Sequence, residues 1–327
     1  MSEFPLIDRL RQRAAMTAGA RGDVALGIGD DAALLAAPQG RQLVIAVDAL
    51  VDGVHVPPGT APADFGWKAL AVNLSDLAAM GAEPAAALLA LALPDADGGF
   101  VDGFAEGFFA LADAHRVALV GGDTTRGPLA ASVTVVGYVP PGEALVRAGA
   151  RDGDDVWVTG TLGDAAGALA LWAAGTPLPR ESALRARLDR PTPRLDAGLA
   201  LRGLASACID ISDGFLADLG HVLAMSGVGA DIDVDALPAS AALREAFPDA
   251  GRRRALQLAG GDDYELCFTA PAPRRAAVGA ALAGSAVAAT RVGRIAAASG
   301  LRLHDAAGRA LPLPERRGWQ HFDGAPA

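Results

Sequence analysis

Acidic residues beside glycines constrain this sequence more than any other feature. The first case is Gly27-Ile28-Gly29-Asp30-Asp31, in which two adjacent carboxylates follow a glycine-rich turn and precede an apolar run. Adjacent carboxylates repel each other, and burial disfavours them unless a cation, hydrogen bonds or an ion pair compensates. A metal ion is the simplest cation, but an aspartate that caps a helix explains a single turn of this kind equally well.

In the first half of the chain, aspartates recur at predicted strand ends and in a helix. The run 42–48 is typical of a buried strand, and it places Asp48 at the strand end, where α/β proteins usually bind ligands. Asp76 falls inside the predicted helix 62–81, where it gains nothing as a cap. Asp123 lies in the glycine-rich loop 121–127, which is expected to follow a strand and to approach an anion closely.

The second half repeats the pattern. Asp210 and Asp213 bracket the predicted end of a strand and the start of a helix, and capping by Ser212 or Asp213 explains one carboxylate but not both. Asp262 begins a second pair of adjacent aspartates after two glycines. Separate capping explanations for all these positions are improbable, so the pattern indicates a site for several Mg²⁺ ions that hold a polyphosphate.

Length, composition and charge predict the number of domains and exclude some partners. The chain has 327 residues, 51% of them hydrophobic, which predicts two well-packed domains. Pro140-Pro141-Gly142 breaks the pattern of elements, so we expect the domain junction between there and about Gly153. No apolar run is long enough to span a bilayer and no export signal is recognisable, so we expect a cytoplasmic protein without a membrane partner. The net charge of −10 argues against nucleic acid as a partner.

The few cysteine and lysine residues limit how this protein can bind phosphate and metal. Cys208 and Cys267 fall in apolar strand-like segments and are expected to be buried thiols. Lys68 is the only lysine, and no P-loop is present. Phosphate must therefore be held by metal ions, arginine and backbone N–H groups.

These motifs together resemble the thiamine-monophosphate kinase family, within the superfamily of aminoimidazole ribonucleotide synthetase and selenophosphate synthetase. The resemblance runs from Gly27 to near the C-terminus and rests on five stretches. They are residues 27–33, 68–82, 121–125, 210–214 and 260–266.

The resemblance implies an α/β (α+β) protein of two domains that forms a homodimer through its N-terminal sheets. Residues 1–145 are expected to form the ATP- and metal-binding dimerisation domain, and residues 146–327 the C-terminal α/β domain that completes the cleft. The implied Mg²⁺ ligands are Asp31, Asp48, Asp76, Asp123, Asp210 and Asp213, with Asp30 either a further ligand or a residue that holds the turn. The implied ATP contacts are Gly122, Asp123, Arg147 and Ser212, and the implied substrate contacts are His55, Asp262 and Trp319.

The implied reaction is the phosphorylation of thiamine monophosphate by ATP, giving thiamine diphosphate and ADP. The sequence departs from the family at Asp262, where the family usually has Glu, so this side chain reaches less far. The alternatives are another ATP-dependent enzyme of the superfamily and a non-catalytic nucleotide-binding dimer. A selenophosphate synthetase would be expected to carry a reactive Cys near its N-terminus, and no Cys precedes Cys208. A hydrogenase-maturation relative would be expected to end in Cys, whereas this sequence ends in Ala327.

Overall fold

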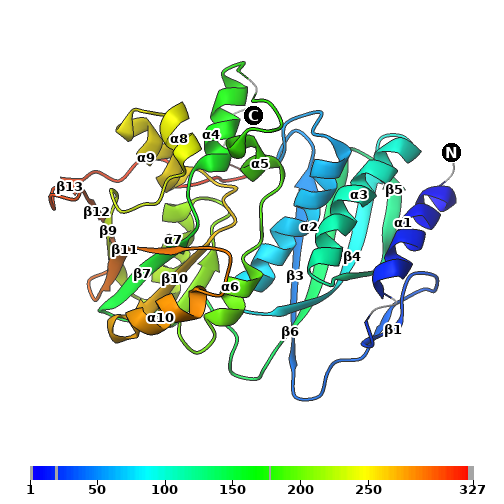
Figure 1. Cartoon of the computed structure of the whole chain (residues 1–327), viewed down its shortest axis with the longest axis horizontal. Coiled ribbons are helices and arrows are strands. Elements are labelled where there is room, and N and C mark those ends of the chain that lie inside the picture. Colours follow the sequence, from blue (N-terminus) through cyan, green and yellow to red (C-terminus); the bar gives the residue numbers. More distant parts are fainter. Residues whose placement is uncertain (1–2, 19–20, 177, 323–327) are drawn as a thin grey trace. The chain divides into compact units, whose positions relative to one another are not determined.

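The computed structural model describes residues 3–18, 21–176 and 178–322 (Figure 1). It separates into two compact units. The first consists of the residues up to Leu77 together with Ala82–Gly142, and the second of Ala78–Gly81 together with the residues from Glu143 onward. Within the described ranges, no helix is long and apolar enough to cross a membrane.

The first unit is built on a four-stranded sheet with the strand order β3-β6-β4-β5. β4 and β5 are parallel and are joined by α3, whereas β6 pairs antiparallel with both β3 and β4. Its elements in chain order are α1 (Glu3–Ala18), β1 (Val24–Leu26), β2 (Leu34–Leu35), β3 (Gln42–Val51), α2 (Pro62–Ala79), β4 (Glu83–Leu93), α3 (Gly98–Ala114), β5 (Ala118–Arg126) and β6 (Ala130–Val139).

Helices α2 and α3 pack closely against each other. A Cβ on Gly66 would lie 2.1 Å from the carbonyl oxygen of Phe104, and one on Gly107 would lie 1.7 Å from that of Ala63. Glycine at both positions lets the two backbones touch, while Phe65 and Phe104 meet with ring centroids 6.3 Å apart. This packing fixes α2, the helix that carries Asp76.

The other face of the sheet is only partly covered. Small apolar residues of β4 and β5 pack there with Val24 and Leu35 of the β1–β2 hairpin. Along β3, side chains at alternate positions remain exposed, with Leu43 at 52%, Ile45 at 64% and Val47 at 61%. We call the face of the sheet that bears these three residues the open face.

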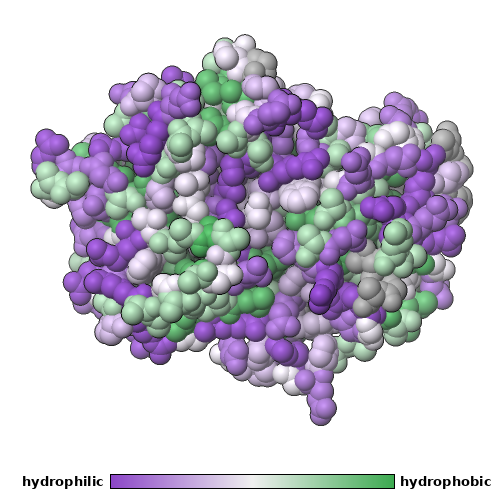
Figure 2. Space-filling view, in the orientation of Figure 1, coloured by the Kyte–Doolittle hydropathy of each residue, from purple (hydrophilic) through white to green (hydrophobic). Residues whose placement is uncertain are grey.

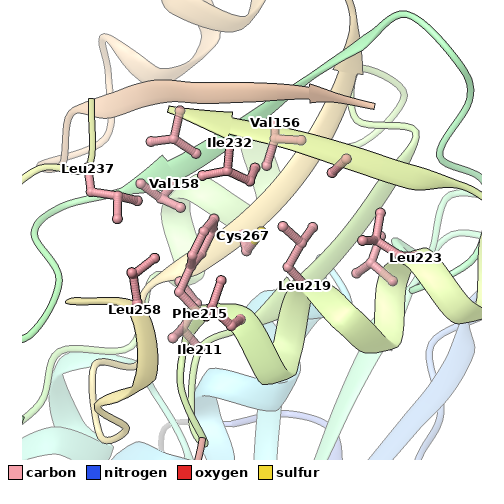
Figure 3. Close-up of a cluster of buried hydrophobic side chains, with 14 of the residues drawn as sticks. Val156, Val158, Ile211, Phe215, Leu219, Leu223, Ile232, Leu237, Leu258 and Cys267 are labelled. Atoms are coloured by element: carbon pink, nitrogen blue, oxygen red, sulfur yellow. The ribbon is translucent and has the colours of Figure 1, made fainter. Parts of the chain in front are cut away.

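The second unit contains a seven-stranded sheet with the order β13-β12-β9-β11-β7-β10-β8. Its main core lies between this sheet and α7. Figure 3 shows Phe215 and Leu219 of α7 pointing toward Val156, Val158 and Cys267 of the strands. The elements are β7 (Asp154–Thr159), α4 (Asp164–Ala173), α5 (Ala183–Asp189), α6 (Leu195–Ala200), β8 (Ala207–Asp210), α7 (Phe215–Ser226), β9 (Gly229–Asp233), α8 (Ala241–Ala246), α9 (Ala250–Ala259), β10 (Leu266–Pro271), η1 (Ala272–Arg274), α10 (Arg275–Leu282), β11 (Ala289–Ala296), β12 (Gly300–His304) and β13 (Ala310–Leu311).

Helix α10 is anchored to the sheet by charge. Arg275 at its start donates from Nη2 to Oδ1 of Asp155 on β7 over 2.7 Å, and Asp155 is fully buried. In the view of Figure 2, hydrophobic residues gather over this alanine-rich helix.

Several predicted elements are confirmed and others are wrong in extent. The helix that carries Asp76 and the strand that ends at Asp210 form as predicted, and both cysteines are buried free thiols. The expected strand 42–48 continues to Val51, and the expected loop 121–127 is mostly strand, because β5 pairs with β4 as far as Arg126. The predicted helix 193–204 forms only over Leu195–Ala200.

Candidate functional site

Asp30 and Asp31 lie between β1 and β2. Both side chains are exposed, and the backbone N–H of Asp31 donates to Oδ1 of Asp30 over 2.8 Å. Asp30 therefore stabilises the turn through one carboxylate oxygen. The carboxylate of Asp31 is presented to solvent by that turn.

Asn73 brings Asp48 and Asp76 to neighbouring positions. Its Oδ1 accepts the backbone N–H of Asp48 over 2.8 Å, and its own Nδ2 donates to the carbonyl of Ala69 over 2.9 Å. Asp76 follows Asn73 by three residues and so lies on the same side of α2. Asp48 is therefore held beside this helix from the middle of β3. The expectation that it ends the strand is wrong, because β3 and β6 remain paired to Val51.

His55 lies in a turn that is fixed at both its ring and its backbone. Its Nδ1 accepts the N–H of Val51 over 3.0 Å, so the neutral ring carries its proton on Nε2. Its carbonyl accepts a hydrogen bond of 3.2 Å from Nζ of Lys68, which is fully buried. The only lysine of the chain thus supports the loop that presents His55.

Gly122 and Asp123 lie inside β5 and not in a loop. Gly122 has φ +153°, and a Cβ there would lie 1.9 Å from the carbonyl oxygen of Leu89 on β4. This close approach requires glycine and keeps the strands paired. Asp123 pairs in register with Ala90 and is exposed.

In the second unit, the site is organised by the loop of residues 212–214 between β8 and α7. One oxygen, Oδ2 of Asp218, accepts the backbone N–H groups of Ser212, Asp213 and Gly214 over 3.1, 3.1 and 3.0 Å. The sequence allowed Ser212 or Asp213 to cap the helix, and this is wrong. The N-cap is Gly214, which has no side chain to cap the helix.

The carboxyl group of Asp218 is buried near two other carboxylates. Desolvation raises its pKa to about 7, with a further contribution from the negative charge of Asp210, while the hydrogen bond from Gly214 opposes this shift. Asp210, at the end of β8, is itself 5% exposed. Three acidic side chains, those of Asp210, Asp213 and Asp218, therefore lie near one another in this unit.

The carbonyl groups of the same loop hold two other predicted site residues. The N–H of Asp262 donates to the carbonyl of Ser212 over 2.8 Å, and the N–H of Trp319 donates to that of Asp213 over 2.9 Å. The structure thus brings Ser212, Asp213, Asp262 and Trp319 together through backbone hydrogen bonds. Arg147 is exposed and lies beside β8, since the neighbouring Val146 accepts the N–H of Cys208.

Asp262 is held in an unusual conformation. Asp262 and Tyr264 have φ values of +65° and +49°, a region that residues other than glycine seldom occupy and that often marks functional sites. The Tyr264 hydroxyl donates to Oδ1 of Asp262 over 3.0 Å. The carboxylate is therefore oriented by its neighbour as well as by its backbone.

Two further acidic residues of the same motif, Asp263 and Glu265, are buried supports. Asp263 accepts the N–H of Gly163 over 2.9 Å, and burial raises its pKa well above the usual value. Glu265 is fully buried and accepts hydrogen bonds of 2.7 Å from Arg187, Arg194 and Thr159. Asp262 and Asp263 therefore do not form one acidic turn, because only the first is accessible.

The predicted site residues are divided between the two compact units. Within the part of the chain that the structure describes, no three His, Cys, Asp or Glu side chains are grouped closely enough to hold a metal ion. The first unit carries Asp30, Asp31, Asp48, His55, Asp76, Gly122 and Asp123, and the second carries Arg147, Asp210, Ser212, Asp213, Asp262 and Trp319.

Sequence reasoning missed the residues that orient the site. Asn73, Asp218 and Tyr264 all lie within or next to the motifs, but their roles depend on contacts that only the fold creates. Asp218 gave one signal, an acidic residue in the first turn of a helix that follows an acidic loop.

Comparison with known proteins defines the class. Residues 29–139 match the N-terminal domain of the AIR synthase related protein family, and residues 151–306 match its C-terminal domain. The chain is 48% identical to a thiamine-monophosphate kinase of Salmonella typhimurium over 90% of both sequences. The chain therefore belongs to the AIR synthase related protein family. Within it, the chain belongs to the thiamine-monophosphate kinase family.

Two solved structures of similar proteins support this family membership. The crystal structure of thiamine-monophosphate kinase from Stenotrophomonas maltophilia is 53% identical, covers 95% of this chain and 98% of its own, and superposes with a TM-score of 0.86. The structure of AaThiL complexed with AMPPCP and TMP is 33% identical, covers 98% and 97%, and has a TM-score of 0.77.

Proposed function

We propose that this protein uses carboxylate-bound Mg²⁺ to transfer the γ-phosphoryl group of ATP directly to thiamine monophosphate. As a member of its family, the chain is a phosphotransferase that forms thiamine diphosphate and ADP. The observation that carries the proposal is the likeness over 98% of the chain to AaThiL, which was solved with AMPPCP and TMP.

The reaction needs positioning more than proton transfer. The acceptor is a phosphate oxygen, and because the second pKa of a phosphate monoester is about 6, it is already largely ionised near neutral pH. Nucleophile and base are therefore not required of the protein. Its task is to hold two anionic groups in line while their repulsion is neutralised.

The proposed Mg²⁺ ligands supply suitable chemistry. They are Asp31, Asp48, Asp76, Asp123, Asp210 and Asp213, with Asp30 as a further candidate. All offer carboxylate oxygen, which Mg²⁺ prefers. The turn at Asp31 and the contact of Asn73 with Asp48 support this set, since both present carboxylates from fixed backbone. Bound Mg²⁺ would neutralise phosphate charge.

The remaining residues are proposed to bind the two substrates. Gly122, Asp123, Arg147 and Ser212 are assigned to ATP. His55, Asp262 and Trp319 are assigned to thiamine monophosphate. For Trp319, Arg316 lies 5.3 Å from the ring centroid, which helps to orient an indole that is 39% exposed. An oriented, accessible indole suits stacking on a thiamine ring.

The open face supports a homodimer. Leu43, Ile45 and Val47 form an exposed apolar row on β3, and burial of such side chains against a second copy is favourable. Across the sheet, Asp123 on β5 pairs with Ala90, Ala90 pairs with Ser132, and Ser132 pairs with Ala49 on β3. Because side chains alternate between the two faces along a strand, Ala49 lies on the same face as Val47, and so does Asp123. A second copy on this face would therefore lie beside a proposed metal ligand.

Asp48→Asn and Asp76→Asn test the metal assignment. Each is expected to lower kcat by about 100-fold or more, because an amide is a weaker Mg²⁺ ligand than a carboxylate. The measurement is ADP formation with and without thiamine monophosphate, on protein whose circular dichroism matches the wild type. Asp102→Asn, an exposed aspartate paired with Arg9, serves as the matched control and should leave the rate unchanged. Full activity in both site variants would refute the assignment.

The product identifies the reaction. ADP that appears only when thiamine monophosphate is added supports the kinase. ADP formation without stimulation by that substrate, or AMP as the product, would favour another enzyme of the superfamily, and nucleotide binding without turnover would favour a non-catalytic dimer.

A further inference from the structure

The loop of residues 212–214 has every backbone polar group engaged. Its three N–H groups converge on Oδ2 of Asp218. Its three carbonyls accept N–H groups in turn, from Asp262, Trp319 and Asp218 itself over 2.8, 2.9 and 3.0 Å. Such a loop has one conformation, because any rearrangement breaks several hydrogen bonds at once.

The segments that meet this loop are shaped to fit it. A Cβ on Gly261 would lie 2.4 Å from the carbonyl oxygen of Ser212, and one on Gly318 would lie 2.8 Å from that of Asp213. Glycine therefore stands directly before Asp262 and directly before Trp319. Both segments approach the loop as closely as their backbones allow.

The side chain of Asp218 serves three backbone groups at once. It is 3% exposed and comes from the first turn of α7. Without its oxygen, three N–H groups would lose their acceptor at the buried start of a helix, where the N-cap Gly214 provides none. The conformation of the loop therefore depends on Asp218.

We propose that Asp218 is a positioning residue for the phosphoryl transfer. It fixes the loop that presents Asp213 to metal and that holds the backbones of Asp262 and Trp319 on the substrate side. The inference rests on the proposed function. Its consequence is that Mg²⁺ binding and thiamine monophosphate binding in this unit share one support, so a change at Asp218 alters both.

A role as a direct Mg²⁺ ligand fits the geometry less well. Oδ2 already accepts three hydrogen bonds, and the side chain is buried. A positioning role requires an oxygen acceptor at this place, whereas a ligand role requires the negative charge. Asparagine keeps the acceptor and removes the charge, so it separates the two roles.

The experiment measures kcat and the apparent KM values for Mg²⁺ and for thiamine monophosphate in three variants. Asp218→Ala is expected to raise both KM values by about 10- to 100-fold, the range seen when groups that orient metal ligands are removed. Asp218→Asn is expected to recover most of both changes. Asp154→Ala is the matched control: Asp154 is also buried and bonds the N–H of Arg151 and the hydroxyl of Ser206, so its loss should lower Tm and leave both KM values unchanged.

The outcomes separate this inference from the function on which it rests. If wild-type protein forms no ADP on addition of thiamine monophosphate, the proposed function fails. If the wild type is active and folded Asp218→Ala has both KM values unchanged, or only one raised, the positioning role is overturned. If Asp218→Ala does not fold, Asp218→Glu decides: the inference stands if Glu, which displaces the carboxylate by one methylene, is worse than Asn in both constants, and falls if Glu is better.

Discussion

At the scale of single residues, Asp263 shows how a buried carboxyl group supports the site at a cost in stability. Oδ1 accepts the N–H of Gly163, while Oδ2 is buried without a hydrogen-bond partner in the described structure. Burial disfavours the ionised form and raises the pKa of this group well above its usual value. The folded protein therefore retains a proton that the unfolded chain releases.

Asp263→Asn is expected to change how stability depends on pH. Between the usual pKa of an aspartate, about 3.9, and the raised pKa of Asp263, unfolding releases a proton, so wild-type stability falls as pH rises, by up to about 1.4 kcal/mol per pH unit. Asparagine has no proton to lose, so this contribution disappears. Urea unfolding at a series of pH values above 4 measures this. The free energy of unfolding of the variant, relative to that of the wild type, should increase as pH increases.

A constant difference between the two proteins at every pH would contradict this. It would mean that Asp263 ionises alike in the folded and unfolded chains. The site assignment would be unaffected, because Asp263 is not proposed to touch substrate.

The sequence located accessible site residues better than it located their supports. Asp76 could be recognised because an aspartate inside an apolar helix is unfavourable by local propensity alone. Asp263 could not be told from Asp262, since both follow the same glycines. They differ only in burial, which is a property of the folded chain.

At the scale of elements, β5 shows a glycine whose role is a close approach. Gly122→Ala would place a Cβ 1.9 Å from the carbonyl oxygen of Leu89, at a φ of +153°. Because backbone must move to relieve this overlap, we expect a loss of about 3 kcal/mol or more in the free energy of unfolding. Chemical denaturation would measure it.

Gly40→Ala is the matched control for this prediction. Gly40 has φ +71° and no atom within 4 Å of an added Cβ, so its substitution carries only the conformational cost, about 1 kcal/mol. Equal losses in the two variants would contradict the prediction. They would show that the overlap with the carbonyl oxygen of Leu89 adds nothing to the loss in the free energy of unfolding.

Element types could be predicted from periodicity, whereas two strand lengths could not. In the sequence Asp48 follows an apolar run, but hydrogen bonds to β6 continue the strand to Val51. The glycines of β5 resemble a loop in sequence, yet pairing with β4 continues to Arg126. Ladder pairing comes from distant segments, so a local pattern contains no record of it.

At the scale of the whole molecule, the open face is the surface on which we propose that a second copy binds. Ile45→Asp places a charge in the apolar row of Leu43, Ile45 and Val47, where association would have to bury it unpaired. We expect the wild-type protein to be a dimer and this variant a monomer by light scattering after gel filtration. Its phosphoryl transfer should also fall, because a second copy on the open face would lie beside Asp123, a proposed Mg²⁺ ligand.

Met225→Asp provides the control for charge and exposure. Met225 is 60% exposed, comparable with Ile45, but it belongs to α7 of the second unit and is not part of the open face. It should leave both the dimer and the activity intact. If Ile45→Asp remains a dimer, the open face is not the interface. If it becomes a monomer with full activity, the second copy adds nothing to the site.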